Sequence, residues 1–235
     1  MTDYSKEMGH LCSHFGIGVA LVVGAYTLLG ATRAYRDYFQ LELFQAVGLA
    51  ESSALFATSE FTVSLFVLAS TAGFGLVDDN RAALDVILRV AAPAGLGLAA
   101  LSVLHGRGAI GGLAWMIGVG ACTFLAYVPL GTMLFDRLLG AAHEDMTSAL
   151  LNLLMDASVL VGTASLLCYK DFVQQPPAGA GAAEAAKHMY DFFAAACWHG
   201  GIAIALLLVA ANVSLGRAVD RRRRVVTKLD AASTL

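Results

Sequence analysis

Two charged residues, Arg89 and Asp156, lie inside long apolar stretches of the sequence. A charged side chain at the centre of a lipid bilayer costs about 3 kcal/mol on insertion scales, so each charge needs a compensating interaction. An ion pair between the two would clasp two helices together or, with Asn152 one helical turn before Asp156, line an ion or proton pathway. In the alternative, Arg89 extends its guanidinium to the lipid headgroups, and Asp156 is neutral or hydrogen-bonded to Asn152.

A second set of candidate residues combines carboxylates with imidazoles. Glu51 and Glu60 lie near the start of one apolar stretch, His105 ends another, and His199 comes early in the last. Carboxylates and imidazoles form proton relays and ligate metals, so these four residues make a possible outer polar set. The alternative is that they are interfacial residues that face water, headgroups or a neighbouring subunit.

The remaining motifs argue against metal, haem and enzymatic chemistry. The four cysteines show no CxxC spacing, and there is no GxSxG, HExxH or phosphate-loop motif. His14 and His199 are the histidines that reach furthest into apolar stretches, and their predicted positions near opposite membrane surfaces argue against a shared haem. We predict no metal site and leave the cofactor open, with haem disfavoured. The missing motifs favour a protein that is not an enzyme, without deciding the question. A net charge of −3 gives no nucleic-acid signature.

One short segment, Gly48-Leu-Ala-Glu51-Ser-Ser-Ala-Leu-Phe56, resembles the carboxylate-bearing helix of the proteolipid c subunit of rotary ATP synthases. The glycine-rich first apolar stretch is similar to that family's first helix. The resemblance would imply ion binding at Glu51. It covers under a third of the chain, lacks the polar loop of that hairpin and is not repeated in the four stretches that follow, so we assign no family from it.

Composition identifies the class of protein to which these residues belong. Hydrophobic residues make up 58% of the chain, charged residues only 14%, and the mean hydropathy is +0.69. A membrane-spanning helix needs about 20 mostly apolar residues, and this length identifies about six candidate spans. We therefore predict an all-α polytopic transmembrane bundle, with five spans as the alternative count and both termini on the same side. The predicted spans are 11–31, 54–77, 84–104, 109–135, 148–169 and 192–216.

Two segments leave the boundaries open. Residues 36–60 mix apolar and charged side chains, and they form either an interfacial helix or an extension of the second span. Residues 171–191 contain Pro176 and Pro177 and then an alanine-rich stretch, which predicts a loop followed by a helix that leads into the sixth span. We divide the chain into one transmembrane domain, 1–216, and a basic extramembrane tail, 217–235.

The distribution of lysine and arginine predicts the orientation of the bundle. With both ends on the cytoplasmic or equivalent side, the inner side holds the larger basic set, because cytoplasmic segments carry an excess of these residues. Which membrane houses the protein is not encoded in this pattern. The inner set is Lys6, Arg81, Arg137, Arg217, Arg221, Arg222, Arg223, Arg224 and Lys228, and the outer set is Arg33, Arg36, Arg107, Lys170 and Lys187.

Small residues recur every fourth position in the fourth predicted span, at Ala114, Gly118, Cys122 and Ala126. Residues four apart lie on one helical face, so another helix can approach this stripe closely. The expected partners are therefore membrane lipids, including bound lipid, and other membrane subunits or further copies of the chain. Three functions are compatible with these features. The first is an accessory or structural subunit of a larger membrane complex, for example an energy-transducing one. The second is a homo-oligomeric ion or proton channel or transporter that uses Arg89 and Asp156. A haem-binding redox subunit is the third.

Overall fold

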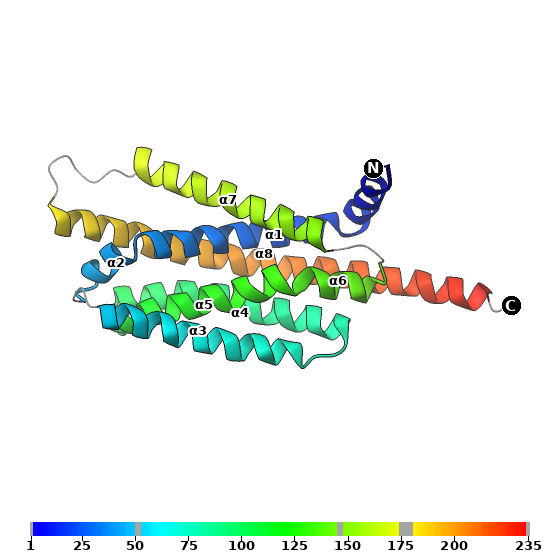
Figure 1. Ribbon diagram of the computed structural model, residues 1–235, viewed down its shortest axis with the longest axis horizontal. Coiled ribbons are helices and arrows are strands. Elements are labelled where there is room, and N and C mark those ends of the chain that lie inside the picture. Colours follow the sequence, from blue (N-terminus) through cyan, green and yellow to red (C-terminus); the bar gives the residue numbers. More distant parts are fainter. Residues whose placement is uncertain (1, 50–52, 145–147, 174–180, 234–235) are drawn as a thin grey trace.

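The computed structural model describes the backbone of residues 2–49, 53–144, 148–173 and 181–233. It is 90% helical, with no strand in the described part of the chain. The helices pack around one apolar core, and the closest neighbours are often far apart in the chain, such as α4 with α8 and α1 with α8 (Figure 1). The helices are α1 (Thr2–Tyr38), α2 (Gln40–Ala46), α3 (Ser53–Gly75), α4 (Asn80–Gly106), α5 (Gly112–Thr132), α6 (Leu134–Ala142), α7 (Ala149–Phe172) and α8 (Ala182–Ser233).

Six of these helices, α1, α3, α4, α5, α7 and α8, are long and apolar enough to cross a membrane. The protein is thus an all-α polytopic membrane protein, as predicted. Helices are the expected solution because a lipid interior offers no water to the backbone amides, which must bond within the segment. α1 begins and α8 ends at the same end of the bundle (Figure 1). We call this the inner end, following the predicted orientation, and the opposite one the outer end.

The spans differ in how much of their surface the bundle buries. α1, α4, α5 and α8 form the centre, while α7 packs mainly on α1 and α3 mainly on α5. Figure 1 shows α7 and α3 along opposite edges of the bundle. Large apolar side chains on α3 and α7 are consequently exposed, as expected of side chains that face lipid. Among them are Phe61 and Leu68 on α3 and Leu160 and Val161 on α7.

The fourth span is shorter than the predicted range 109–135. α5 ends at Thr132, Met133 leaves the helical conformation with φ −124°, and the chain continues as the separate helix α6. Pro129 lies one turn before this break, and proline removes a backbone hydrogen bond from a helix. α6 then buries Leu134, Phe135 and Leu138, and it packs chiefly on α4.

The uncertain segment 36–60 divides into three parts. α1 runs past its predicted end at residue 31 to Tyr38, and α2 is a separate short helix that buries Leu43 and Phe44 against the bundle. Gly48 has φ 76°, in the left-handed region that glycine adopts without strain, and it turns the chain towards α3. Residues 50–52 lie outside the described part.

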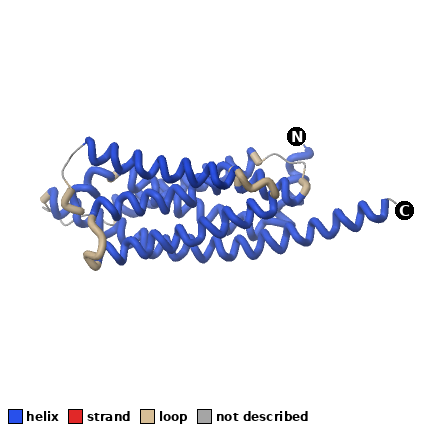
Figure 2. Tube along the Cα trace, turned by 90° about the horizontal axis from the view of Figure 1, so that it is seen from below, coloured by secondary structure: helices blue, strands red, loops and turns tan. Residues whose placement is uncertain are grey.

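α8 continues through Gly216 without a break and is 52 residues long. A helix of this length extends about 78 Å, far more than the hydrocarbon core needs, and Figure 2 shows it projecting beyond the other helices. Its basic segment is attached to the inner end of the bundle. Arg222 Nε lies 2.9 Å from Glu144 Oε1 as an ion pair, without hydrogen-bond geometry, and Arg223 Nε donates to the Ala141 carbonyl.

The central helices cross closely at glycines. A Cβ placed on Gly201 of α8 would lie 2.5 Å from the Gly95 carbonyl oxygen of α4, which no real side chain tolerates. On the predicted small-residue stripe, Gly118 faces Leu101 and Cys122 faces Gly97, both on α4. Ala126 is buried and Ala114 is exposed. Gly118 and Cys122 therefore have partners within the same chain.

Candidate functional site

The most concentrated polar arrangement inside the spans joins α1 to α3. Arg36 Nη2 donates to Glu60 Oε1 at 2.6 Å, and Arg36 Nη1 donates to Glu60 Oε2 at 3.5 Å, so the guanidinium contacts both carboxylate oxygens. Gln40, one turn after Arg36, donates from Nε2 to Glu60 Oε1 at 2.8 Å. Arg36 of α1 and Gln40 of α2 thus both donate to one carboxylate on α3. Charge-assisted, bidentate contacts such as that of Arg36 are stronger than neutral hydrogen bonds.

Two further charges complete what we call the outer charged cluster: Arg33, Arg36, Asp37, Gln40 and Glu60. Asp37 lies 3.5 Å from Arg36 and 3.7 Å from Arg33. The side chain of Arg36 is only 1% exposed, whereas those of Asp37 and Glu60 are 41% and 42% exposed. The cluster therefore has a buried cation and two carboxylates that open to the outside of the bundle.

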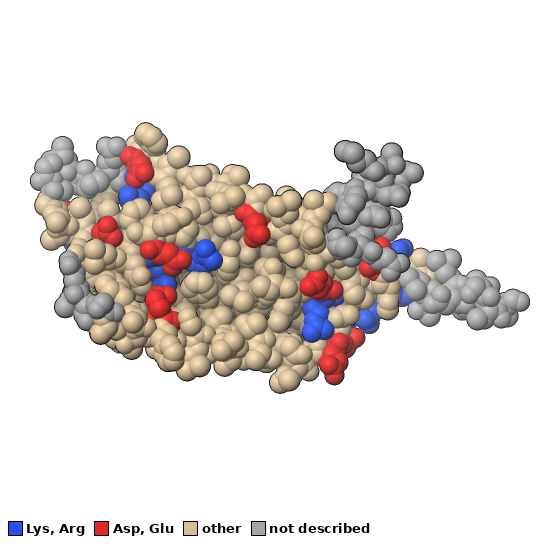
Figure 3. All heavy atoms as spheres, in the orientation of Figure 1, with Lys and Arg blue, Asp and Glu red and all other residues tan. Residues whose placement is uncertain are grey.

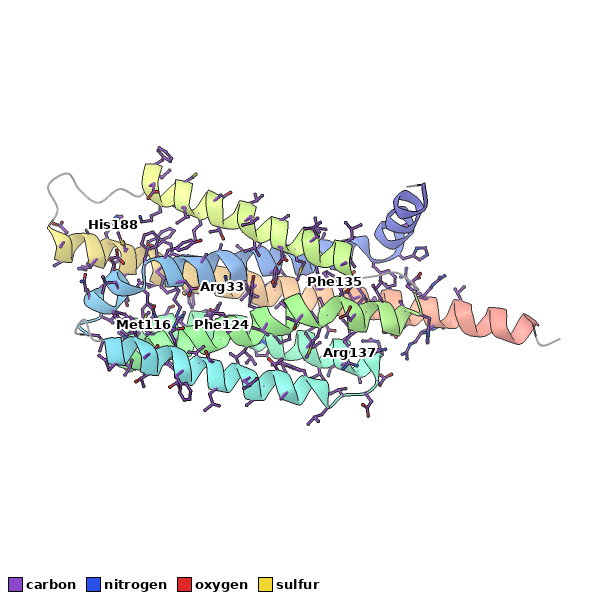
Figure 4. The ribbon with its side chains drawn as sticks, viewed as in Figure 1. Arg33, Met116, Phe124, Phe135, Arg137 and His188 are labelled. Atoms are coloured by element: carbon purple, nitrogen blue, oxygen red, sulfur yellow. The ribbon has the colours of Figure 1, made fainter. Side chains whose placement is uncertain are left out.

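Aromatic rings hold the remaining cation, Arg33. Its guanidinium carbon lies 4.9 Å from the centre of the Tyr127 ring and 5.9 Å from that of Phe124. Tyr127 stacks in turn on Tyr26 at 4.4 Å. Figure 4 shows Arg33 beside Phe124. A cation over an aromatic face is stabilised by the ring quadrupole, which helps an arginine to remain within an apolar span.

Gly120 of α5 makes room for the buried guanidinium. A Cβ at this position would lie 3.0 Å from Arg36 Nη2 and 3.0 Å from a methyl carbon of Val63. Any other residue would press on the cation or on α3. The absence of a side chain at Gly120 therefore allows the Arg36 and Glu60 pair to sit against α5.

A groove leads from the cluster along α3 and α5. It has a volume of about 330 Å³, and Glu60 is the one charged residue among the described residues that line it. Its other lining residues are Val63, Ser64, Val67, Leu68, Thr71, Phe124 and Val128. The open carboxylate of Glu60 is thus reached through an apolar groove with two hydroxyl groups.

The four charged residues of the cluster lie within the membrane-spanning parts of the chain, whereas Gln40 belongs to α2. Arg33, Arg36 and Asp37 belong to the span Ser13–Tyr38, and Glu60 belongs to the span Ala54–Gly75. Glu60 is seven residues into α3, about 10 Å from its outer end at the helical rise. In the space-filling view of Figure 3, acidic and basic side chains gather in a mixed patch on a mostly uncharged face. Ionisable groups at this depth usually serve a function.

The predicted pair of Arg89 and Asp156 is not formed. Arg89 Nε lies 2.7 Å from Asp85 Oδ2, one turn earlier on α4, and the Arg89 side chain is 71% exposed. Asp156 is exposed on α7, which packs on α1 and not appreciably on α4. A local partner one turn away satisfies the arginine, because residues four apart face each other on a helix.

In the described part of the chain, no side-chain hydrogen bond joins Asn152 to Asp156 one turn later on α7. The backbone amide of Asn152 bonds to the Ser148 carbonyl. α7 is held to α1 elsewhere, where the hydroxyls of Thr27 and Ser158 lie 2.9 Å apart. A Cβ on Gly162 would also collide with Thr27. The hydroxyl contact and the close approach at Gly162 thus position α7, whereas Asp156 faces outwards.

The structure does not bring the residues of the predicted outer polar set together in one site. Glu60 belongs to the outer charged cluster, and Glu51 lies outside the described residues. His105 stacks on Trp115 at 5.1 Å, and its Nδ1 bonds to the Ile110 carbonyl at 3.0 Å. His199 is exposed, and its Nδ1 bonds to the Ala195 carbonyl. Among the described residues, no three His, Cys, Asp or Glu side chains group closely enough to hold a metal ion.

Sequence reasoning missed Arg33, Arg36, Asp37 and Gln40 because the first span was predicted to end at residue 31. A usable signal was present. Arg33 with Asp37, and Arg36 with Gln40, are spaced four apart, which is the interval of facing residues on a helix. That spacing indicates that the helix continues past residue 31, and α1 in fact runs to Tyr38.

Comparison with known proteins gives a family and no function. Neither a curated protein nor a solved structure matches the chain. One family model, described as a family of unknown function and designated DUF5690, matches residues 2–210. Since this match covers most of the 235 residues, all six spans among them at least in part, the chain belongs to the DUF5690 family.

Proposed function

We propose that the protein transports an ion or proton across its membrane, with Glu60 as the protonatable or cation-binding group. The observation that carries this proposal is the outer charged cluster, in which a fully buried arginine pairs with a carboxylate that is 42% exposed. A structural clasp needs no opening to the outside. A transport site does, because the ion or proton must reach the carboxylate.

The cluster suggests how binding could be coupled to movement. Arg36 and Gln40 hold Glu60 through hydrogen bonds of 2.6 and 2.8 Å. Protonation of Glu60, or a cation beside it, weakens the attraction to Arg36 and loosens α3 from α1. α3 has few other contacts with the centre of the bundle apart from those with α5. A charge change at Glu60 would therefore favour a shift of α3.

The two exposed carboxylates also favour a homo-oligomer. Asp37 and Glu60 open away from the core of a single chain, and charges that face hydrocarbon are costly. A second copy placed against this face would enclose them in a shared polar pathway. This arrangement keeps the oligomeric interpretation and replaces Arg89 and Asp156 by Arg36 and Glu60 as the residues on the route.

Ion flux into proteoliposomes tests the proposal. Purified protein is reconstituted into vesicles that contain a dye for H⁺, Na⁺ or K⁺, and flux of each ion is driven by its own gradient in a separate arm. Glu60→Gln retains an oxygen that can accept from Arg36 and removes the charge, so flux falls to that of empty vesicles. Asp85→Asn is the matched control, since it removes the carboxylate of the exposed pair with Arg89, and it keeps full flux. Equal flux in Glu60→Gln and unchanged protein contradicts the proposal.

The second candidate is an accessory subunit of a larger membrane complex. It is favoured by the exposed apolar faces of α3 and α7 together with the charges between them. In this case another kind of chain covers the outer charged cluster. A native gel of gently solubilised membranes separates the two candidates, because a homo-oligomer gives a multiple of one chain mass and a subunit migrates with other chains.

A further inference from the structure

A second cavity lies between α1 and α8 at the inner end of the bundle, whereas the outer charged cluster lies at the opposite end. It has a volume of about 980 Å³. α1 and α8 meet tightly beside it, where a Cβ on Gly18 would collide with Leu215. The cavity is therefore a groove beside a firm helix contact.

The groove changes polarity in the same direction on both helices. On α8, Ala210 and Val213 line its deeper part, and Arg217 and Arg221 line the part nearer the inner end. On α1, Leu21 and Ile17 line the deeper part, and His14 lies nearer the inner end. From Ala210 to Arg221 the distance along the helix is about 16 Å. Both walls thus run from apolar to polar over the depth of one lipid leaflet.

The polar end of the groove carries an excess of positive charge. Three arginines line it, and none of the described lining residues is Asp or Glu. Arg222 pairs with Glu144, whereas Arg217 and Arg221 have no ion-pair partner in the described part of the chain. They lie four residues apart on one face of α8, so both can contact one anionic group.

We propose that this groove binds an anionic glycerophospholipid of the inner leaflet, with its phosphate at Arg217 and Arg221 and an acyl chain along Ile17, Leu21 and Val213. Guanidinium groups form paired hydrogen bonds with phosphate, and basic pockets between helices at the cytoplasmic face recognise anionic headgroups. Free phosphate would leave the apolar walls unused. A zwitterionic lipid carries its own ammonium group, which repels the unpaired arginines.

Native mass spectrometry of the detergent-purified protein tests the site. The full chain is titrated separately with phosphatidylglycerol, phosphatidylcholine and inorganic phosphate. Phosphatidylglycerol is expected to bind best. The double variant Arg217→Gln with Arg221→Gln lowers its affinity about 25-fold, since each arginine near an anionic headgroup strengthens binding about fivefold. Arg224→Gln is the control, because this exposed neighbour on α8 does not line the groove, and its effect stays below twofold.

Three results would overturn the proposal. Equal binding of phosphatidylglycerol and phosphatidylcholine removes the headgroup selectivity. Inorganic phosphate that displaces phosphatidylglycerol at equal concentration makes the apolar walls irrelevant. Equal losses in the double variant and in Arg224→Gln show a diffuse basic surface instead of a site. Both variants are expected to remain folded, because Arg217, Arg221 and Arg224 are exposed. Size-exclusion profiles check this.

Discussion

Arg36 Nη2 lies 2.6 Å from Glu60 Oε1, and this ion pair joins α1 to α3, two helices that share no extended packing interface. The pair is asymmetric, because the arginine is buried and the glutamate is open on one side. Truncation of Glu60 would leave a buried positive charge whose nearest remaining carboxylate is Asp37, at 3.5 Å. Stability and transport therefore depend on the same contact, and each can be measured separately.

Glu60→Leu is expected to destabilise the protein by about 3 kcal/mol, because it leaves Arg36 buried without its main partner. Adding Arg36→Met should recover most of that loss, since an apolar pair of similar volume can replace a buried ion pair at little cost. Unfolding in mixed micelles, followed by circular dichroism, measures both changes. A double variant that is less stable than Glu60→Leu would show that the charge of Arg36 is not the source of the instability.

Gly201→Ala should weaken the crossing of α4 and α8. The new Cβ would lie 2.5 Å from the Gly95 carbonyl oxygen and 3.0 Å from the Ala99 amide nitrogen. Both are backbone atoms, so the helices must separate, at a cost of about 1 to 3 kcal/mol. The thermal midpoint in detergent measures the effect. Gly200→Ala is the matched control, with no atom within 4 Å of its Cβ, and it should be neutral or slightly stabilising.

Arg89 and Asp156 should behave as independent residues. In a double-variant cycle with Arg89→Gln and Asp156→Asn, the changes in unfolding free energy are expected to add, because the two side chains have different surroundings. The cycle of Arg89→Gln with Asp85→Asn should instead show a coupling of about 0.3 to 0.5 kcal/mol, typical of exposed pairs four residues apart. A coupling above 1 kcal/mol between Arg89 and Asp156 would contradict this expectation and support the ion pair predicted from the sequence.

The predicted orientation places the basic end of α8 inside. In a cysteine-free background, Arg224→Cys should react with a membrane-impermeant maleimide only after the cells are opened, and Glu184→Cys should react in intact cells. Both positions are exposed, at opposite ends of α8. The reverse pattern would place the tail outside and contradict the orientation, while leaving the bundle unchanged.

Several features of the fold could be predicted from local sequence alone. Hydropathy identified the six spans, since apolar stretches of sufficient length must form helices in lipid. The alanine-rich segment after Pro177 was predicted to be helical, and α8 begins there at Ala182. Two residues of the predicted stripe, Gly118 and Cys122, face α4. The end of α5 was predicted too late, because the apolar run continues through Met133 whereas the helix stops.

What the sequence by itself determined, therefore, is which segments cross the membrane, because that depends on the transfer of each segment from water to lipid and needs no partner. Only the tertiary structure decided which polar residues meet. Arg36 and Glu60 are 24 residues apart with a turn and a short helix between them, and their contact requires α5 to present Gly120 at the point where they converge. Arg89 found a carboxylate on its own helix instead of Asp156, because a neighbour one turn away is always within reach and a distant one only when the helices pack.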